Sequence, residues 1–355
     1  MPESAHPSPF TPEDRVWRFL DRAVSGLARR SLRSGAKRVP QSPALRTTQA
    51  RIERISVLAE GVRSFELASL SGEALPAWQP GCHVDVTLPS GRQRQYSLCG
   101  DLADTRRYRI AVRHLPQGAG GSVELHSLRE HDMLRIGTPR NAFPFIDAPR
   151  YFFVAGGIGI TAILPMLRLA QARGAEWTFA YLGRSRASLP FLDEIAALSA
   201  HDPGRVHIWA DDEQHGMAPV ARLIELAPAS APLYACGPAP LLAALRALAP
   251  HPRITSLHDE RFAPAAVLNG AAFEIELARS GGSVQVGARE SALAAIRRRL
   301  PHVAYSCQQG FCGTCKVQLL AGDVEHRDSA LTPEQRRAAM TLCVSRGRGR
   351  IVVDL

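Results

Sequence analysis

The cysteine spacing near the C-terminus constrains this chain more than any other feature of its sequence. One stretch holds a C-x4-C-x2-C motif with a further cysteine downstream: Cys307, Cys312, Cys315 and Cys343. This spacing is typical of four thiolates that hold a [2Fe–2S] cluster. Gly310 and Gly313 lie between these cysteines, and glycine permits the positive φ angles that turn backbone N–H groups toward sulfur atoms. The pattern predicts one such cluster, with these four cysteines as its metal ligands.

Two other interpretations of the cysteines remain open at this point. A zinc site with four cysteine ligands usually pairs them in two C-x2-C units, whereas here one gap is four residues and Cys343 stands alone. Four unrelated buried thiols are not expected to fall in so compact an arrangement. Cys82 and Cys99 lie outside this stretch and are interpreted as structural residues.

The composition indicates a folded chain of several domains. Its 355 residues are 45% hydrophobic and 21% charged, and about 150 residues per domain predicts two or three domains. No apolar run approaches the ~18–20 residues that span a bilayer, and the polar, proline-rich start has no signal-peptide core. We therefore expect a cytoplasmic protein without a transmembrane segment, whose cysteines are free thiols or metal ligands rather than disulfides.

The net charge of +10 is concentrated at the two ends of the chain. Residues 1–50 hold nine Lys or Arg against four Asp or Glu, and residues 271–355 hold twelve against eight. The central part is close to neutral and the basic residues are almost all arginine, so the charge alone does not indicate a nucleic-acid binder. Residues 1–46 predict a partly disordered extension with a basic amphipathic helix, which either packs on this protein or lies on an anionic surface.

The hydrophobic pattern changes twice along the rest of the chain. Short alternating runs from residue 47 onward predict an antiparallel β-barrel, and alternating strands and helices from residue 149 predict a parallel sheet with helices on both faces. A hairpin, a helix and further strands around the cysteines predict a small α+β domain. The predicted divisions are an extension 1–46, a barrel 47–148, an α/β domain 149–262, a linker 263–272 and a cysteine-containing domain 273–355.

One predicted barrel strand carries groups suited to a flavin. Arg94 offers a two-pronged donor for a phosphate, Tyr96 a flat face for a ring, and Ser97 a hydroxyl group. The glycine-rich residues 118–122 precede a predicted helix over 123–128, and such a loop presents backbone N–H groups to an anion. The motif is short, so a purely structural barrel strand is the alternative interpretation.

A second glycine-rich run indicates a dinucleotide. Gly156, Gly157, Gly159 and Thr161 follow an apolar strand over 151–155 and precede a helix, the context in which such a run binds a pyrophosphate. The sequence Cys236, Gly237, Pro238 ends a later strand, where ligands bind in open α/β sheets, although a buried structural cysteine is the alternative there. Arg184 and Arg186 follow the second strand, and two arginines can accept a 2′-phosphate.

These motifs together resemble the phthalate dioxygenase reductase family, which includes the vanillate demethylase reductase component. The resemblance rests first on the stretch from Ser306 to Cys315, with residues 325–329 and 343–346. It implies a plant-type ferredoxin domain of the β-grasp type. It also implies that Cys307 and Cys312 hold the more exposed iron, while Cys315 and Cys343 hold the inner one.

The other motifs extend the resemblance over residues 47–355. Residues 94–98 resemble the R-x-Y-[ST] strand of ferredoxin-reductase flavin domains, and residues 110–113 resemble the strand that lines the same flavin. Residues 118–122 match the place of the flavin phosphate, and no adenine-holding loop is recognised, so FMN is expected rather than FAD. The Cys236 turn is expected beside the nicotinamide, and Phe262 is expected to cover the flavin ring. The family mostly prefers NADH, with NADPH possible.

The expected function is that of a reductase component. Electrons would pass from NADH through FMN and the [2Fe–2S] cluster to the Rieske non-haem iron component of an aromatic-ring dioxygenase or O-demethylase. A cytochrome P450 acceptor is the alternative within the class, and a non-enzymatic metal-binding protein is the alternative outside it. The catalytic residues expected are Cys236, Phe262 and Ser97. The cofactor-binding residues expected are Arg94, Tyr96, Ser97, Leu98, Ala111, Val112, Arg113, Gly120, Gly121, Ser122, Gly156, Gly157, Gly159, Thr161, Arg184, Cys236, Gly237, Pro238 and Phe262.

Overall fold

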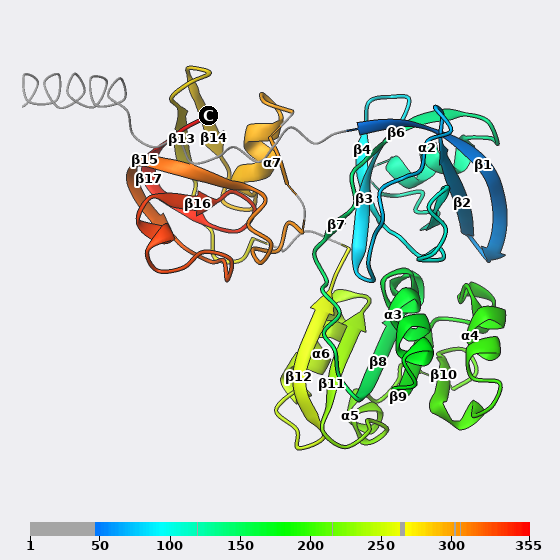
Figure 1. Ribbon diagram of the computed structural model, residues 1–355. Helices are drawn as coiled ribbons and strands as arrows, with labels where there is room; N and C mark the ends of the chain where they lie inside the picture. Colours follow the sequence, from blue (N-terminus) through cyan, green and yellow to red (C-terminus); the bar gives the residue numbers. More distant parts are fainter. Residues whose placement is uncertain (1–46, 119, 215, 263–266, 302, 306) are drawn as a thin grey trace, which may run out of the picture. The chain divides into compact units, whose positions relative to one another are not determined.

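The computed structural model describes residues 47–355, apart from residues 119, 215, 263–266, 302 and 306 (Figure 1). The helix predicted within residues 1–46 lies outside the described residues. In the described part the strands form three separate sheets, and each sheet falls within one of the three domains that the sequence predicts. The exact boundaries of those domains stay a prediction.

The first sheet is an antiparallel barrel, as predicted. Its strands are β1 (Thr47–Ala59), β2 (Val62–Ser69), β3 (Cys82–Thr87), β4 (Gln93–Ser97), β5 (Arg107–Arg113), β6 (Met133–Gly137) and β7 (Arg140–Asn141). They are ordered β4-β3-β6-β1-β2-β5, with β7 paired to β3. The backbone N–H of Cys99 donates to the carbonyl of Arg109 at 2.9 Å, which joins the two ends of this order. Alternate side chains such as Phe65, Tyr108 and Ile110 fill one core, because successive strand residues face opposite sides.

The second sheet is parallel and is covered on both faces. Its strands are β8 (Arg150–Gly156), β9 (Glu176–Gly183), β10 (Val206–Ala210), β11 (Ala231–Cys236) and β12 (Ile254–Glu260), in the order β10-β9-β8-β11-β12. Its helices are α3 (Ile160–Ala172), α4 (Leu192–Leu198), α5 (Val220–Glu225) and α6 (Ala239–Leu248). Along β8, Tyr151 and Phe153 enter the core beneath α3, while Phe152 and Val154 enter the core with α5 and α6. This alternation confirms the predicted two-sided packing.

The strand order of this sheet also fixes where a ligand can bind. The chain runs outward from β8 to β9 and β10, and then places β11 and β12 on the other side of β8. The connections after β8 and β11 therefore leave in opposite directions and open a crevice at the carboxyl ends of these strands. Both predicted nucleotide motifs lie at these two strand ends.

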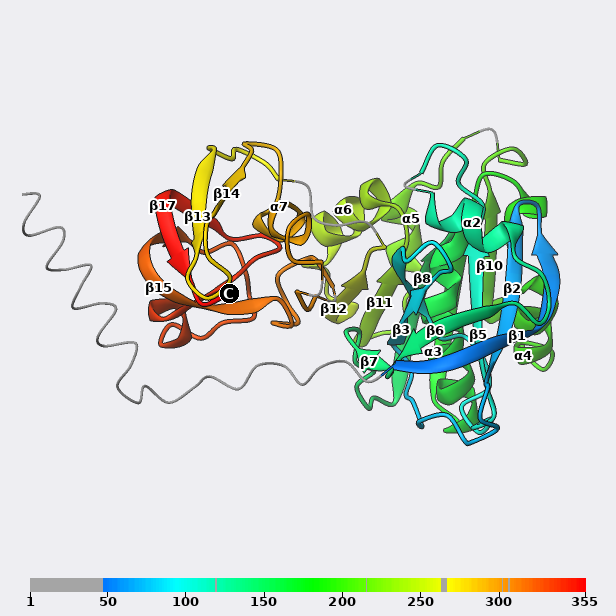
Figure 2. The same ribbon diagram turned by 90° about the horizontal axis from the view of Figure 1, so that it is seen from above.

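The third sheet carries the cysteine-rich loop. Its strands are β13 (Phe273–Leu277), β14 (Ser283–Val286), β15 (Lys316–Glu325), β16 (Ala339–Thr341) and β17 (Arg346–Val353), in the order β14-β13-β17-β15-β16. Helix α7 (Ala292–Arg297) lies beside β14 (Figure 2), and its buried apolar side chains belong to the same core. The Ser291 hydroxyl caps this helix by accepting a hydrogen bond from the Ala294 N–H at 3.2 Å. The mixture of parallel and antiparallel strands with one helix confirms the α+β prediction.

Several short elements complete the described chain. A seven-residue helix, α2 (Gly121–Ser127), lies in the barrel domain, and four 3-10 turns are η1 (Gly157–Gly159), η2 (Arg186–Ser188), η3 (Pro203–Arg205) and η4 (Gln335–Arg337). Among the described residues, no helix combines the length and the apolar character needed to cross a membrane.

Candidate functional site

The predicted flavin-phosphate loop and the predicted flavin strand are in contact. A Cβ atom added to Gly121 would lie 2.6 Å from Cγ and Nε of Arg94, so a side chain there would displace Arg94 from its present position. Gly120 has a φ of 78° and precedes α2, a backbone conformation that glycine adopts without strain. Arg94 therefore lies against a turn of glycines, an arrangement that fits a phosphate group.

Arg92 is a further cation at this loop, and the sequence analysis did not single it out. A Cβ atom on Gly120 would meet its Nε at 3.5 Å, and its guanidinium is held by Glu124 at 2.9 Å. The R-x-R spacing was the signal, since Arg92 directly precedes β4 and lies two residues before Arg94, and alternate residues of an extended segment share a face. Ser122 has a local role, because its Oγ accepts a hydrogen bond from the Leu115 N–H at 3.1 Å and closes the loop.

The predicted ring-contacting residues lie on β4 and β5. Tyr96 is half-buried, and burial raises the pKa of its hydroxyl to about 12, so it stays neutral. Ser97 and Leu98 are buried at the end of β4, and Ala111 and Val112 are buried on β5. The Cys99–Arg109 backbone bond holds these two strand segments side by side. The structure thus brings together two motifs that lie about a dozen residues apart in the sequence.

The two predicted nucleotide motifs, residues 156–161 and residues 236–238, are in direct backbone contact. A Cβ on Gly159 would lie 2.6 Å from the carbonyl carbon of Cys236, and a Cβ on Gly156 would lie 2.6 Å from Cδ of Pro238. Gly237 in turn lies directly against the Gly156 backbone. No side chain fits at these positions, so the glycines are explained by the close approach of two backbone turns. Two backbone turns therefore meet at the switch point, which is where a pyrophosphate binds in open α/β sheets.

The first turn of α3 adds further groups to this motif. Gly157 has a φ of 53°, and a Cβ there would lie 3.8 Å from Nη1 of Arg113, so this barrel arginine reaches the glycine turn. The Thr161 hydroxyl donates to the Ile158 carbonyl at 3.0 Å and stabilises the turn. Arg184 is exposed at the end of β9.

Cys236 and Glu260 end two neighbouring strands in register. Cys236 is fully buried, and burial together with Glu260 and Asp259 raises the pKa of its thiol well above the usual range. It is therefore a neutral thiol rather than a thiolate nucleophile. Burial also raises the pKa of the Glu260 carboxyl to about 8, so this group stays protonated at neutral pH. Phe262 follows two residues later and is 49% exposed.

Replacing Glu260 with glutamine is expected to change how stability depends on pH. The folded-state pKa of about 8 lies above the usual value of 4.5 for a glutamate, so the folded protein binds more protons and loses stability as pH rises between these values. Above pH 8, Glu260 lowers the free energy of unfolding by about 5 kcal/mol, at 1.36 kcal/mol per pKa unit. The urea concentration at which half the protein is unfolded should therefore be the same for Glu260→Gln and the parent protein near pH 5. At pH 8.5 it should be higher for Glu260→Gln. A difference between the two proteins that does not vary with pH would contradict this assignment.

The four cysteines predicted as ligands form two pairs. The side chains of Cys307 and Cys312 lie close enough to perturb each other's pKa, and so do those of Cys315 and Cys343. Among the described residues, no three such side chains converge on one point that could hold a single ion. Four thiols brought together in this way fit the ligand set of the [2Fe–2S] cluster that their spacing predicts.

Backbone N–H groups surround these sulfur atoms. Gln309 donates its N–H to Cys307 Sγ at 3.3 Å, and further backbone donors reach Cys312, Cys315 and Cys343. Gly310 and Gly313 have φ angles of 85° and 70°, which confirms their predicted conformation. Such donors stabilise the negative charge of a cluster and tune its potential. Cys307 and Cys312 are half-buried whereas the other two are buried, in line with the outer and inner pairs that the resemblance implies.

A buried aspartate fixes the loop that carries this motif. Asp328 accepts hydrogen bonds from the Leu331 N–H at 2.9 Å and the Ser345 hydroxyl at 3.0 Å. Ser329 and Ala330 donate their N–H groups to the Gly310 carbonyl. Residues 325–329 therefore help to position the cysteine loop through hydrogen bonds, which explains why this run accompanies the cysteines in the motif.

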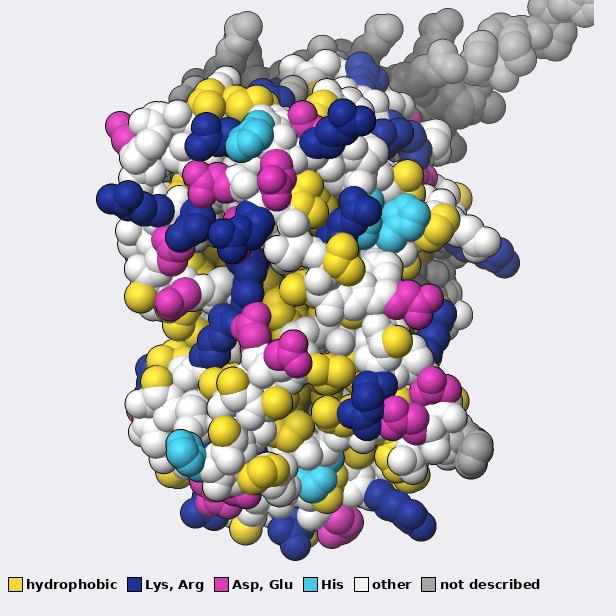
Figure 3. Space-filling view, turned by 90° about the vertical axis from the view of Figure 1, so that its right-hand side faces the viewer, with side chains coloured by type: hydrophobic (Ala, Val, Ile, Leu, Met, Phe, Trp, Pro, Cys, Tyr) yellow, Lys and Arg dark blue, Asp and Glu magenta, His cyan; other side chains and the backbone are white. Residues whose placement is uncertain are grey.

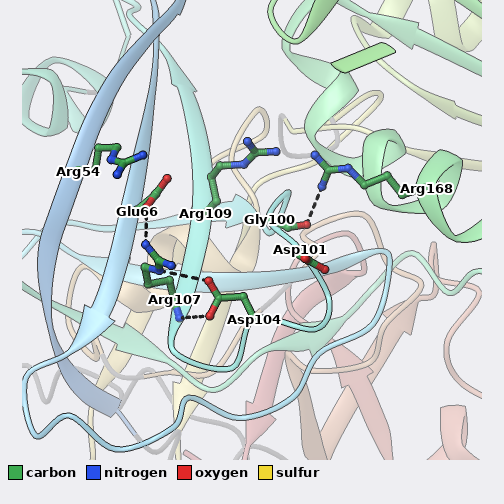
Figure 4. Close-up of a pocket in the computed structure, with 8 residues that line it drawn as sticks. All are labelled: Arg54, Glu66, Gly100, Asp101, Asp104, Arg107, Arg109 and Arg168. Atoms are coloured by element: carbon green, nitrogen blue, oxygen red, sulfur yellow. Dashed lines mark hydrogen bonds and ion pairs between the residues drawn. The ribbon is translucent and has the colours of Figure 1, made fainter. Parts of the chain in front are cut away.

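An ion-pair network that sequence reasoning missed joins the barrel to the α/β domain. Arg109 on β5 donates to Glu194 of α4 at 2.8 and 3.1 Å, and Arg168 of α3 pairs with the same carboxylate. Arg168 also donates to the carbonyls of Cys99 and Gly100, at 3.1 and 2.7 Å. These arginines line a polar cavity of about 540 Å³ (Figure 4). Because the carbonyls directly follow the predicted flavin strand, the network positions that segment.

The charged side chains on the face drawn in Figure 3 are interleaved. Basic side chains form a central column, and acidic side chains lie beside it. Elsewhere in the barrel domain, Arg107 pairs with Asp104 at 3.2 Å and with Glu66 at 3.4 Å. Side chains of both signs therefore lie close together on the surface.

Comparisons with known proteins agree with this geometry. A family model described as "2Fe-2S iron-sulfur cluster binding domain" matches residues 275–346. The reductase subunit of the tert-butanol monooxygenase / tert-amyl alcohol desaturase of Aquincola tertiaricarbonis is 35% identical over 321 residues, which cover 86% of this chain and 95% of that protein. Phthalate dioxygenase reductase of Burkholderia cepacia is 32% identical over 308 residues, covering 84% of this chain and 94% of that protein.

Solved structures show the same relationship. A crystal structure of an intact type IV self-sufficient cytochrome P450 monooxygenase has a TM-score of 0.69 at 33% identity, and the match covers 90% of this chain but only 43% of that one. The structure of phthalate dioxygenase reductase, described as modular for electron transfer from pyridine nucleotides to [2Fe-2S], has a TM-score of 0.66 at 32% identity and covers 87% of this chain and 98% of that one. The chain belongs to the phthalate dioxygenase reductase family of electron-transferring oxidoreductases.

Proposed function

We propose that this protein is the reductase component of a Rieske non-haem iron oxygenase and passes electrons from NADH through FMN and a [2Fe–2S] cluster. The observation that carries the proposal is that one chain holds both a switch-point crevice of backbone turns and a loop with two pairs of thiols. The crevice suits a nicotinamide dinucleotide, which delivers electrons in pairs. The cluster accepts one electron at a time, so a carrier that converts between the two is required.

FMN fits the barrel on the residues present. The Arg94 side chain lies against Gly121, and neither Gly120 nor Gly121 carries a Cβ atom that would narrow the space for a phosphate. When bound, FMN supplies the chemistry of accepting two electrons as a hydride and releasing them singly. We assign the phosphate to Arg94, Gly120, Gly121 and Ser122, and the ring to Tyr96, Ser97, Leu98 and residues 111–113.

The chain's own groups prepare the nicotinamide side. The crevice formed by Gly156, Gly159 and Gly237 binds the pyrophosphate and directs the nicotinamide toward Cys236. Cys236 is fully buried and neutral, and the protonated Glu260 beside it adds no negative charge, so this end of the crevice excludes water without an unpaired charge. Phe262 is exposed enough to lie on the ring until the nicotinamide displaces it.

The acceptor is a separate protein in this proposal. Among the relatives are a phenoxybenzoate dioxygenase subunit at 36% identity and a vanillate O-demethylase oxidoreductase at 34%. A haem acceptor is the second candidate, favoured by a heme-dependent oxidative N-demethylase beta subunit at 38% identity and by the P450 fusion already described. Electron delivery from the same preparation to a Rieske component and to a P450 distinguishes the two.

One set of spectra tests the proposed function. The purified protein is expected to show flavin and iron–sulfur absorption that bleaches when NADH is added anaerobically, and to contain iron and sulfide rather than zinc. A colourless protein, or one whose colour NADH leaves unchanged, would overturn it. We also place the protein in the cytoplasm, a proposal supported by seven cysteines that form no disulfide in the structure.

A further inference from the structure

We propose that Glu213 determines the preference for NADH over NADPH, because it holds Arg186 in an ion pair that denies this arginine to a 2′-phosphate. The inference rests on the proposed NADH site and goes beyond it by naming a residue that selects the nucleotide. In sequence, two arginines after β9 indicated a possible 2′-phosphate site, and no acidic residue stood beside them. The acidic residues come instead from the end of the neighbouring strand, β10.

The topology places the adenosine of the nucleotide near these residues. The pyrophosphate lies at the turn after β8, and the nicotinamide lies toward Cys236 at the end of β11 in the proposed function. The sheet order is β10-β9-β8-β11-β12, so the other half of the dinucleotide extends over the ends of β9 and β10. Those two strand ends carry Gly183 and Ala210, followed by the loops that hold Arg186 and Glu213.

The two loops are fastened to each other by the backbone. The Asp211 N–H donates to the Gly183 carbonyl at 2.9 Å, and the Asp212 N–H donates to the Arg184 carbonyl at 3.0 Å. The Asp212 carboxylate also accepts a hydrogen bond from the Glu213 N–H at 3.0 Å. These hydrogen bonds fix the backbone of residues 211–213 against the loop that carries Arg186. The Glu213 side chain therefore starts from a backbone position that already lies opposite Arg186.

The Arg186–Glu213 contact uses both prongs of the guanidinium. Nε donates to one carboxylate oxygen at 2.8 Å and Nη2 to the other at 2.9 Å. The two side chains are 50% and 40% exposed, so the pair lies at the surface that a ribose would approach. The carboxylate takes the Nε–Nη2 edge of the guanidinium and neutralises its charge, so this bidentate edge is not open to a phosphate while the pair persists.

The local charge acts in the same direction. Three consecutive acidic residues, Asp211, Asp212 and Glu213, face a loop with two arginines. A 2′-phosphate brings nearly two negative charges to this edge, whereas the 2′-hydroxyl of NADH brings none. Removing one carboxylate therefore both frees the arginine and lowers the repulsion of the phosphate.

The test compares Glu213→Gln with the parent protein, using 2′,5′-ADP and 5′-AMP as probes. Glutamine keeps the size of the side chain and removes its charge. We expect calorimetric binding of 2′,5′-ADP to the purified protein to strengthen about tenfold while 5′-AMP binding changes less than twofold, as a freed charge-assisted contact implies. The ratio of kcat/KM for NADPH to that for NADH should rise by a similar factor.

Two control variants separate this effect from a general change in surface charge. In Glu213→Gln combined with Arg186→Gln, the gain for 2′,5′-ADP should disappear. Asp202→Asn removes one carboxylate from another exposed pair of the same domain, Arg205–Asp202, and should leave both ratios unchanged. An unchanged ratio in Glu213→Gln, or a gain that survives loss of Arg186, would overturn the inference. If the parent protein oxidises neither nucleotide, the proposed function itself fails.

Discussion

Cys343→Ala is expected to leave the protein without a stable [2Fe–2S] cluster. Cys343 is buried near Cys315, and removing it leaves the inner iron one ligand short inside an apolar core. Iron and sulfide per chain should fall at least tenfold, and the iron–sulfur absorption should disappear. Electron delivery to the oxygenase component should fall about a hundredfold or more, a loss of ~2.7 kcal/mol or more in transition-state terms.

The same variant should keep the reactions that do not need the cluster. The barrel and the α/β domain have cores of their own, so NADH-dependent reduction of ferricyanide should persist. Cys82→Ala is the matched control, because it removes a buried cysteine of the barrel and should leave the iron content unchanged. A Cys343→Ala protein with full iron content and an unaltered spectrum would show that this cysteine is not a ligand.

Gly159→Ala is expected to disable nucleotide use while leaving the cluster intact. A Cβ at this position would lie 2.6 Å from the Cys236 carbonyl carbon, so the turn after β8 and the turn after β11 would have to separate. Gly159 itself has a φ of –58°, which alanine adopts without strain, so the effect is steric. We expect kcat/KM for NADH to fall about a hundredfold, equivalent to ~2.7 kcal/mol.

Two comparisons make the second prediction specific. Gly204→Ala places its Cβ at an ordinary 3.4 Å from Asp202 and should leave kcat/KM within twofold of the parent. Dithionite should still reduce the cluster of Gly159→Ala, because the cluster domain has a separate core. Wild-type kinetics in Gly159→Ala would mean that the two turns do not form the nucleotide site.

Much of the fold was accessible from sequence because its signals are local. The apolar pattern predicts strands over residues 206–210, 273–277 and 283–286, and β10, β13 and β14 occupy these residues. The alternation of Tyr151 to Val154 between two cores follows from strand geometry alone. Strand β16 was missed because three residues are too short to show a period. The pattern predicts a last strand over 350–353, whereas β17 begins at Arg346, because alternating Arg and Gly over 346–349 hide the apolar pattern.

The sequence by itself determined the chemistry: cysteine spacing indicated the cluster, and glycine runs indicated the nucleotide and flavin loops. These groups act within a few residues of one another, so spacing along the chain fixes their geometry. Only the tertiary structure decided which charges meet. Arg186 and Glu213 are 27 residues apart, Arg109 and Glu194 are 85 apart, and Glu260 is neutral only because packing buries it. Such contacts depend on how strand ends from different parts of the chain converge, and no local pattern encodes that convergence.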